Sequence, residues 1–246
     1  MRFAFALLPL LALAACGGGT ENASTPVTSS TPVAQAAPPA GKQWVDIVSK
    51  TPEGGFRQGN PEAPIQLVEY GSRTCPTCGR FAAEGVEPLR QKYVSTGKVS
   101  YEFRDFPLHG PPDLALALLN QCVGTEAFFP MLDQMFANQA NFGEKMTALP
   151  ETFMQQFQTM APPQAAAAMA EGMGAIEFVK QRGIPEAKAR QCLADQAVIK
   201  SIADVMADAS NNRGVQGTPS FFINGKAVDA AMWSQVETAL QAAGAR

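Results

Sequence analysis

The 246-residue sequence has little histidine and no excess of basic charge. Its one histidine excludes any mechanism that needs two. The 19 basic side chains are outnumbered by 22 acidic ones, which argues against a nucleic-acid partner because nucleic-acid binders present a basic face. Five cysteines are too few for a disulfide-dense mini-protein, and their odd number leaves one thiol that needs its own explanation.

Long apolar runs are also lacking. The longest covers residues 3–15, which is shorter than the roughly 20 residues a membrane-spanning helix needs. Arg2 precedes this run and small residues end it, so residues 1–15 are predicted to be a signal peptide. The small residues lead into Cys16 and three glycines, which resembles a bacterial lipobox whose cysteine is acylated. The alternative is a plain signal peptide followed by a chance cysteine.

The segment after Cys16 is poor in aromatic and charged residues. Residues 17–40 are rich in Gly, Ser, Thr, Pro and Ala, and Glu21 is the acidic residue among them. Such a composition buries too little apolar surface to offset the entropy lost on ordering. We therefore expect residues 16–43 to be a lipidated cysteine with a disordered tether, and the folded part to begin near Trp44.

The first folded part, residues 44–110, has the pattern of a strand, a helix and a strand. Residues 44–48 alternate as a possible edge strand, and residues 65–70 are a short β-branched run that predicts a second strand. Pro76 fits the first turn of a helix, inside which Pro88 should produce a kink. Residues 99–103 alternate again, so a βαβ unit is predicted.

Residues 111–213 are alanine-rich and lack strand signals, and they are predicted to form several helices, the last with Asp195 as its N-cap. Residues 214–246 then contain a hairpin around Asn224-Gly225 and a closing helix from Trp233. The predicted fold class is α/β. The first and last parts would form one sheet, and the all-helical insertion would pack over it.

The motif Cys75-Pro76-Thr77-Cys78 lies where a strand gives way to a helix. The unpaired N–H groups at a helix start favour the thiolate, which is the nucleophile, and Arg73 and Arg80 should add positive potential. The structural alternative is half a zinc site, but zinc needs two further ligands. The other cysteines are isolated and His109 stands alone in the sequence, so no metal is predicted.

A second motif, Gly217-Thr218-Pro219-Ser220, directly precedes a predicted strand, where a proline is tolerated because it donates no sheet hydrogen bond. With the two cysteines it resembles the cis-proline loop of the thioredoxin superfamily. Residues 68–78, 104–108 and 217–225 together resemble the DsbA-like family of thiol–disulfide oxidoreductases. The resemblance runs from about Gly54 to the C-terminus and implies a thioredoxin-like fold with an inserted helical domain.

The resemblance implies roles within the Cys75–Cys78 motif, which also contains Pro76 and Thr77. Cys75 would be the exposed attacking thiol and Cys78 the resolving one. Thr77 stands where the best-known oxidases of the family have histidine, which implies a less oxidising disulfide. His109 is interpreted as a surface or packing residue.

The resemblance also implies that Thr218 and Pro219 are joined by a cis bond and that the Thr218 backbone pairs with the substrate chain. Glu69 would be the family's buried acid, which exchanges a proton with Cys78. A carboxyl group in such surroundings has a raised pKa. The alternative is a partly exposed glutamate at the end of a strand.

Cys122 and Cys192 both fall in predicted helices of the insertion. In an exported protein two such cysteines usually pair, and the resemblance implies a second, non-catalytic disulfide. Two buried free thiols, or a redox relay through Cys192, are the alternatives.

These observations predict a lipid-anchored thiol–disulfide oxidoreductase that faces the periplasm and needs no bound cofactor. Its partners would be exported proteins with cysteines and a membrane redox partner, and disulfide formation is the favoured direction. The rivals are a reductase or isomerase with the same dithiol, and a non-enzymatic metallochaperone that uses Cys75 and Cys78. The membrane that holds the anchor, outer or inner, is left open.

Overall fold

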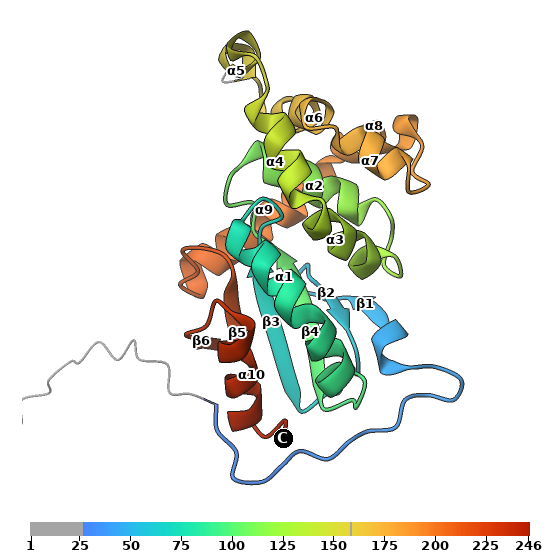
Figure 1. Ribbon diagram of the computed structural model, residues 1–246, viewed down its shortest axis with the longest axis vertical. Coiled ribbons are helices and arrows are strands. Elements are labelled where there is room, and N and C mark those ends of the chain that lie inside the picture. Colours follow the sequence, from blue (N-terminus) through green and yellow to red (C-terminus); the bar gives the residue numbers. More distant parts are fainter. Residues whose placement is uncertain (1–26, 158) are drawn as a thin grey trace, which may run out of the picture.

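The computed structural model describes residues 27–157 and 159–246, and these form a mixed sheet covered by helices (Figure 1). The strand order is β1-β2-β4-β3-β5-β6, and β3 and β4 run parallel. The predictions for residues 1–15 and Cys16 lie outside the described residues. The strands are β1 (Val48–Lys50), β2 (Phe56–Gln58), β3 (Ile65–Gly71), β4 (Val99–Asp105), β5 (Ser220–Ile223) and β6 (Lys226–Val228).

Alternate side chains of the central strands enter different cores. Leu67 packs into the core that includes residues of α1 (Pro76–Leu89) and α10 (Trp233–Ala242). The next residue, Val68, packs into a smaller core with residues of α9 (Gln196–Asn212). The sheet is thus covered on both faces, which explains why β3 and β4 carry so many apolar residues.

The insertion folds as predicted, as a bundle of short helices with its own core. In Figure 1 most of it lies beyond the end of the sheet at which α1 begins, while its last helix, α9, runs back against one face of the sheet. Its last helix, α9, starts with the Asp195 carboxylate accepting hydrogen bonds from the N–H groups of Ala197 and Val198. The other helices are α2 (Pro111–Gln121), α3 (Phe128–Ala137), α4 (Gln139–Thr147), α5 (Glu151–Phe157), α6 (Pro162–Gly172), α7 (Ala175–Lys180) and α8 (Glu186–Leu193).

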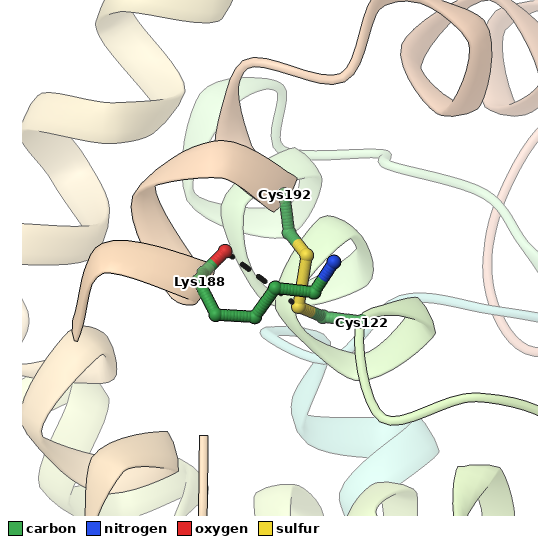
Figure 2. The surroundings of a disulfide bond; sticks show 3 residues. All are labelled: Cys122, Lys188 and Cys192. Carbon is green, nitrogen blue, oxygen red and sulfur yellow. Dashed lines mark hydrogen bonds between the residues drawn. A yellow bond between two sulfur atoms is a disulfide. The ribbon is translucent and has the colours of Figure 1, made fainter. Parts of the chain in front are cut away.

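Cys122 and Cys192 form a disulfide that joins the end of α2 to α8 (Figure 2). The pairing agrees with the expectation from the resemblance, and the alternative of two buried free thiols is not found. The Lys188 carbonyl lies 3.9 Å from the Cys122 sulfur, so α8 packs closely against the bridge.

The expectation of a disordered tether is wrong for its described part, residues 27–43. This segment runs along the end of the sheet next to the C-terminus (Figure 1). The N–H groups of Ser29, Val33 and Ala36 bond to backbone carbonyls of the folded domain. The Ala36 carbonyl accepts a hydrogen bond from the Trp44 indole at 2.7 Å. Backbone hydrogen bonds order a segment whose composition alone would not. We call residues 27–43 the strap.

Smaller differences occur near the edge of the sheet and in α1. Residues 44–46 form a 3₁₀ turn rather than an edge strand, and β2 was not predicted because three residues show no periodicity. The kink expected at Pro88 takes the form of a π-helical turn at Arg90–Val94, which is consistent with the N–H that proline lacks. Among the described helices, none has the length and apolar character needed to cross a membrane.

Candidate active site

The two motif cysteines lie at the carboxyl end of β3, where α1 begins. Cys75 is the N-cap residue of α1 and Pro76 occupies its first turn, where a missing N–H has no cost. Because β3 and β4 are parallel, the loops that follow both strands meet at this edge of the sheet. The site is therefore built from the β3–α1 turn, the β4–α2 loop and the loop before β5.

The Thr218-Pro219 bond is cis, and the Cys75 sulfur lies 3.2 Å from the Thr218 carbonyl oxygen. The structure thus brings together the two motifs that are 143 residues apart in the sequence. Cys75 is only 5% exposed and Cys78 is 0% exposed. The expectation of an exposed Cys75 is therefore wrong in degree, because the Thr218 backbone covers its sulfur, although Cys75 remains the more accessible of the two.

The two thiols have opposite acidities. The pKa of Cys75 falls to about 5, chiefly because the Cys78 thiol donates a hydrogen bond to it. Burial opposes this shift, while the Thr218 side chain and the N–H groups of Cys78 and Thr77 add to it. The pKa of Cys78 is raised, mainly by burial and then by its hydrogen bond to Cys75 and by the charge of Glu69. The site thus favours a thiolate at Cys75 and a protonated thiol at Cys78, which is the order of acidity that the predicted roles of attacking and resolving thiol require.

Glu69 is buried, with 1% exposure, so the alternative of a partly exposed strand-end residue is not found. The Tyr101 hydroxyl donates a hydrogen bond to Glu69 Oε2 at 2.6 Å. Burial raises the pKa of Glu69 to about 8. The other oxygen, Oε1, is buried without a hydrogen-bond partner among the described residues. Glu69 is therefore a neutral acid at pH 7 that can give a proton to a Cys78 thiolate as that thiolate forms.

The expectation that Arg73 and Arg80 add positive potential at Cys75 is not supported by where the two side chains lie. Arg73 is buried, its guanidinium is paired with Asp105, and it stacks over the Phe103 ring. Asp105 compensates its charge, so Arg73 stabilises the packing of the site instead of presenting free positive potential to Cys75. Arg80 is exposed on α1. The Cys78 thiol, the Thr218 side chain and the N–H groups at the helix start supply the stabilisation of the thiolate.

Three polar residues of the site were not identified from the sequence. Tyr101 partners Glu69, Asp113 accepts hydrogen bonds from the turn before Cys75, and Gln139 donates to the Arg73 and Cys75 carbonyls. His109 is on the surface, as interpreted, but its Nδ1 lies 2.7 Å from the Thr74 hydroxyl. Its position after β4 was a usable signal, because that end of the strand lies beside Cys75.

Within residues 27–157 and 159–246, no group of three or more His, Cys, Asp or Glu side chains is arranged to hold a metal ion. Cys75 and Cys78 are both free thiols. The site thus offers a dithiol that can cycle with a disulfide.

Comparison with known proteins gives consistent matches. The family model described as thioredoxin matches residues 51–242. A Rickettsia felis protein, named provisionally as a protein-disulfide oxidoreductase, is 24% identical over 205 residues, which are 83% of this chain and 65% of that protein. A relative from Rickettsia bellii is 24% identical over 73% of this chain and 60% of its own length. The chain thus spans somewhat less than two thirds of these curated relatives.

The solved structures agree. A protein-disulfide isomerase from Novosphingobium aromaticivorans has a TM-score of 0.73 and 29% identity, and the match covers 76% of this chain and 96% of that one. Wolbachia pipientis α-DsbA1 has a TM-score of 0.57 at 21% identity, over 76% of this chain and 90% of that one, and shows the same fold. The chain therefore belongs to the thioredoxin family, and its resemblance to the DsbA-like thiol–disulfide oxidoreductases is confirmed.

Proposed function

We propose that this protein is a thiol–disulfide oxidoreductase of the bacterial cell envelope that favours disulfide formation in exported proteins. The observation that carries the proposal is the pair of unequal thiols, a Cys75 whose pKa is about 5 beside a buried Cys78 whose pKa is raised. A stabilised thiolate favours the reduced form, so the disulfide readily accepts electrons. The cis Thr218-Pro219 loop beside the sulfur provides a backbone edge for a substrate chain.

In the proposed reaction, a substrate thiolate attacks the Cys75 sulfur of the Cys75–Cys78 disulfide. A mixed disulfide forms and Cys78 leaves as a thiolate, which takes a proton from the neutral Glu69 carboxyl. A second substrate thiolate then attacks the substrate sulfur of the mixed disulfide and releases the Cys75 thiolate. The substrate loses two electrons and the protein gains them, and a partner that carries a disulfide restores the oxidised form.

An apolar groove near the site supports polypeptide substrates. Its volume is about 720 Å³, and it lies between the β4–α2 loop, α6 and α9. Leu108, at its edge, is 38% exposed and adjoins His109, which contacts Thr74. Ile199, Ile202 and Met206 of α9 line the far side. An apolar stretch of an unfolded chain would fit here while its cysteine reacts at Cys75.

The test is refolding of a reduced, scrambled substrate, combined with the reduction potential against glutathione. We expect catalysed refolding. We also expect a reduction potential nearer to about −120 mV, which is characteristic of a strong oxidase, than to about −270 mV, which is characteristic of a reductase. Thr77 in place of histidine should keep the value below that of the strongest oxidases. A potential near the lower value would favour the reductase rival. Stoichiometric metal binding without turnover would favour the metallochaperone.

Isomerisation is the second candidate, because the Novosphingobium aromaticivorans structure carries the name protein-disulfide isomerase. A substrate with fully formed but wrong disulfides separates the two activities. An isomerase rearranges them in its reduced form, whereas an oxidase does not.

Lipid anchoring at Cys16 remains part of the proposal. The described chain begins at Val27, at the end of the sheet opposite the start of α1 (Figure 1). Acylation of Cys16, which precedes the strap in the sequence, would hold the folded domain at a membrane surface. Labelling with a radioactive fatty acid in a bacterial host tests this. Label should enter the full chain and be absent from a Cys16→Ala variant.

A further inference from the structure

The turn before Cys75 is held by a buried carboxylate of the helical insertion. Asp113, in the first turn of α2, is 2% exposed. Its Oδ1 accepts hydrogen bonds from the Thr74 N–H at 2.9 Å and from the Thr74 hydroxyl at 2.8 Å. Its Oδ2 accepts from the Ser72 hydroxyl at 2.7 Å and from the His109 N–H at 2.9 Å. One side chain thus fixes residues on two loops of the site.

The Thr74 hydroxyl has a single proton to donate, and this determines which atom is the donor in its contact with His109. The Thr74 hydroxyl has one proton, which goes to Asp113, yet the His109 Nδ1 lies 2.7 Å from the same hydroxyl oxygen. His109 Nδ1 must therefore be the donor in this contact, and the threonine oxygen the acceptor. Each contact from His109 through Thr74 to Asp113 then has one donor and one acceptor, whereas an unprotonated Nδ1 would place two acceptors against each other.

A second clamp comes from α4. The Gln139 Nε2 donates to the Arg73 carbonyl at 2.8 Å and to the Cys75 carbonyl at 2.9 Å. A side chain at Gly79, in the first turn of α1, would come within 2.3 Å of the Gln139 oxygen, so this amide lies directly against the start of the helix. Asp113 and Gln139 therefore hold the turn at different points, and both belong to the insertion.

We propose that Asp113, with His109 and Gln139, is a set of positioning residues that keeps the Cys75 sulfur at the start of α1 and beside Thr218. The inference deepens the proposed function and rests on it, because it makes the helical insertion part of the reactive centre. The groups that stabilise the thiolate are the Cys78 thiol, the Thr218 side chain and the N–H groups of Cys78 and Thr77, so they lie at the start of α1 and in the loop before β5. Each acts only within hydrogen-bond distance, so loosening the turn removes several of them together.

The test uses Asp113→Ala and Asp113→Asn in the full chain. The readouts are the absorbance titration of the Cys75 thiolate and the reduction potential. We expect Asp113→Ala to raise the titration midpoint of Cys75 by about one pH unit, which is a tenfold fall in the acid dissociation constant of its thiol. Asp113→Asn should raise it less, because its carbonyl can still accept from Thr74 while its amide opposes the His109 N–H. The matched control is Glu177→Gln, an exposed acid of the same insertion.

Folding is followed separately by thermal unfolding and by retention of the Cys122–Cys192 disulfide. If Asp113→Ala does not fold, the paired variants His109→Ala and His109→Asn take its place, since the asparagine amide can replace the Nδ1–H. Asparagine should restore what alanine loses, and Gln139→Ala should raise the midpoint independently. Folded variants with an unchanged midpoint and potential would overturn the inference. The thiolate titration needs no substrate, so failure of the proposed function would appear separately, as absence of turnover in the unchanged protein.

Discussion

At the scale of single residues, the reactivity of the site follows from where two sulfurs lie. Cys75 meets the start of a helix, and Cys78, one turn later, lies in the core with no exposure. The same type of side chain is therefore ionised at Cys75 and stays protonated at Cys78 at neutral pH. The difference is a matter of hydrogen-bond donors and burial, since no histidine is available within the motif.

The first prediction concerns the thiolate. With a Cys75 pKa of about 5, the reduced protein should show a thiolate absorbance transition centred near pH 5. Cys75 would then be about 99% ionised at pH 7. Cys78→Ala should move the transition to higher pH because the largest stabilising hydrogen bond is lost, and Cys75→Ala should abolish it. A transition near pH 9 in the unchanged protein would show that the helix start does not activate the thiol.

The second prediction concerns Glu69 and stability. Its pKa is about 8 in the fold and 4.5 in its ordinary state, so between these pH values the folded protein holds a proton that the unfolded chain has lost. The contribution of Glu69 to the free energy of unfolding should therefore fall as pH rises through this window, by about 1.4 kcal/mol for each unit of pKa difference. Below pH 4.5 the full contribution is present. Cys75, whose pKa is lowered, contributes in the opposite direction over an overlapping window, so the two must be separated.

Glu69→Gln should remove most of this pH dependence, since glutamine does not ionise. Urea unfolding at pH 5 and at pH 8 in a Cys75→Ala background, which removes the opposing titration of Cys75, measures the slope, with the exposed Glu177→Gln as the control. If the two variants and their common background lose stability in parallel, the raised pKa of Glu69 is not the cause.

At the scale of elements, helix starts and strand ends position the chemistry. The parallel pairing of β3 and β4 aligns Gly71 with Asp105, so the turn that carries Cys75 and the loop that carries His109 lie at one edge. The antiparallel pairing of β3 with β5 aligns Tyr70 with Ser220 and so brings in Pro219. Each of the three site loops is thus held by a hydrogen-bonded neighbour.

The third prediction concerns the Cys122–Cys192 disulfide, which joins residues 70 apart. Closing a loop of this size removes entropy from the unfolded chain, so Cys122→Ser with Cys192→Ser should lower the free energy of unfolding by roughly 4 kcal/mol in the chain-entropy model. Equilibrium urea unfolding measures the loss. The Cys122→Ser and Cys192→Ser single variants should each lose a similar amount, because either change opens the same loop. Unchanged stability in the double variant would show that α2 and α8 are held by packing alone.

At the scale of the whole molecule, the strap closes the end of the sheet opposite the active site. Val27 and Val33 pack against the main core, and the C-terminal Arg246 guanidinium donates to the Ser29 and Ser30 carbonyls. The strap and the C-terminus therefore stabilise each other, and the catalytic edge is left unobstructed.

The fourth prediction follows from this contact. A chain that begins at Gln43 should be less stable than one that begins at Val27, by about 1–3 kcal/mol, because two part-buried valines and several backbone hydrogen bonds are lost. Urea unfolding of the two truncated proteins gives the difference. Equal stability would show that residues 27–43 act only as a tether. The Cys75 thiolate titration is the control and should be the same in both proteins, because Cys75 is far from the strap.

The sequence by itself determined the order of elements and the reactive pair. Pro76 after Cys75, Asp195 as a helix cap and Asn224-Gly225 as a hairpin turn are local features, because each acts on backbone within a few residues. The resemblance carried by the motifs added the cis bond at Pro219 and the pairing of Cys122 with Cys192, and the structure has both.

Only the tertiary structure decided what depends on partners far away in the chain. Arg73 forms an ion pair with Asp105, and Glu69 accepts a hydrogen bond from Tyr101. The turn before Cys75 is held by side chains of the insertion. Burial and hydrogen bonding between distant segments set these outcomes, and neither has a period or a spacing that can be read along the sequence. The strap is ordered for the same reason, since its acceptors and donors belong to the far end of the fold.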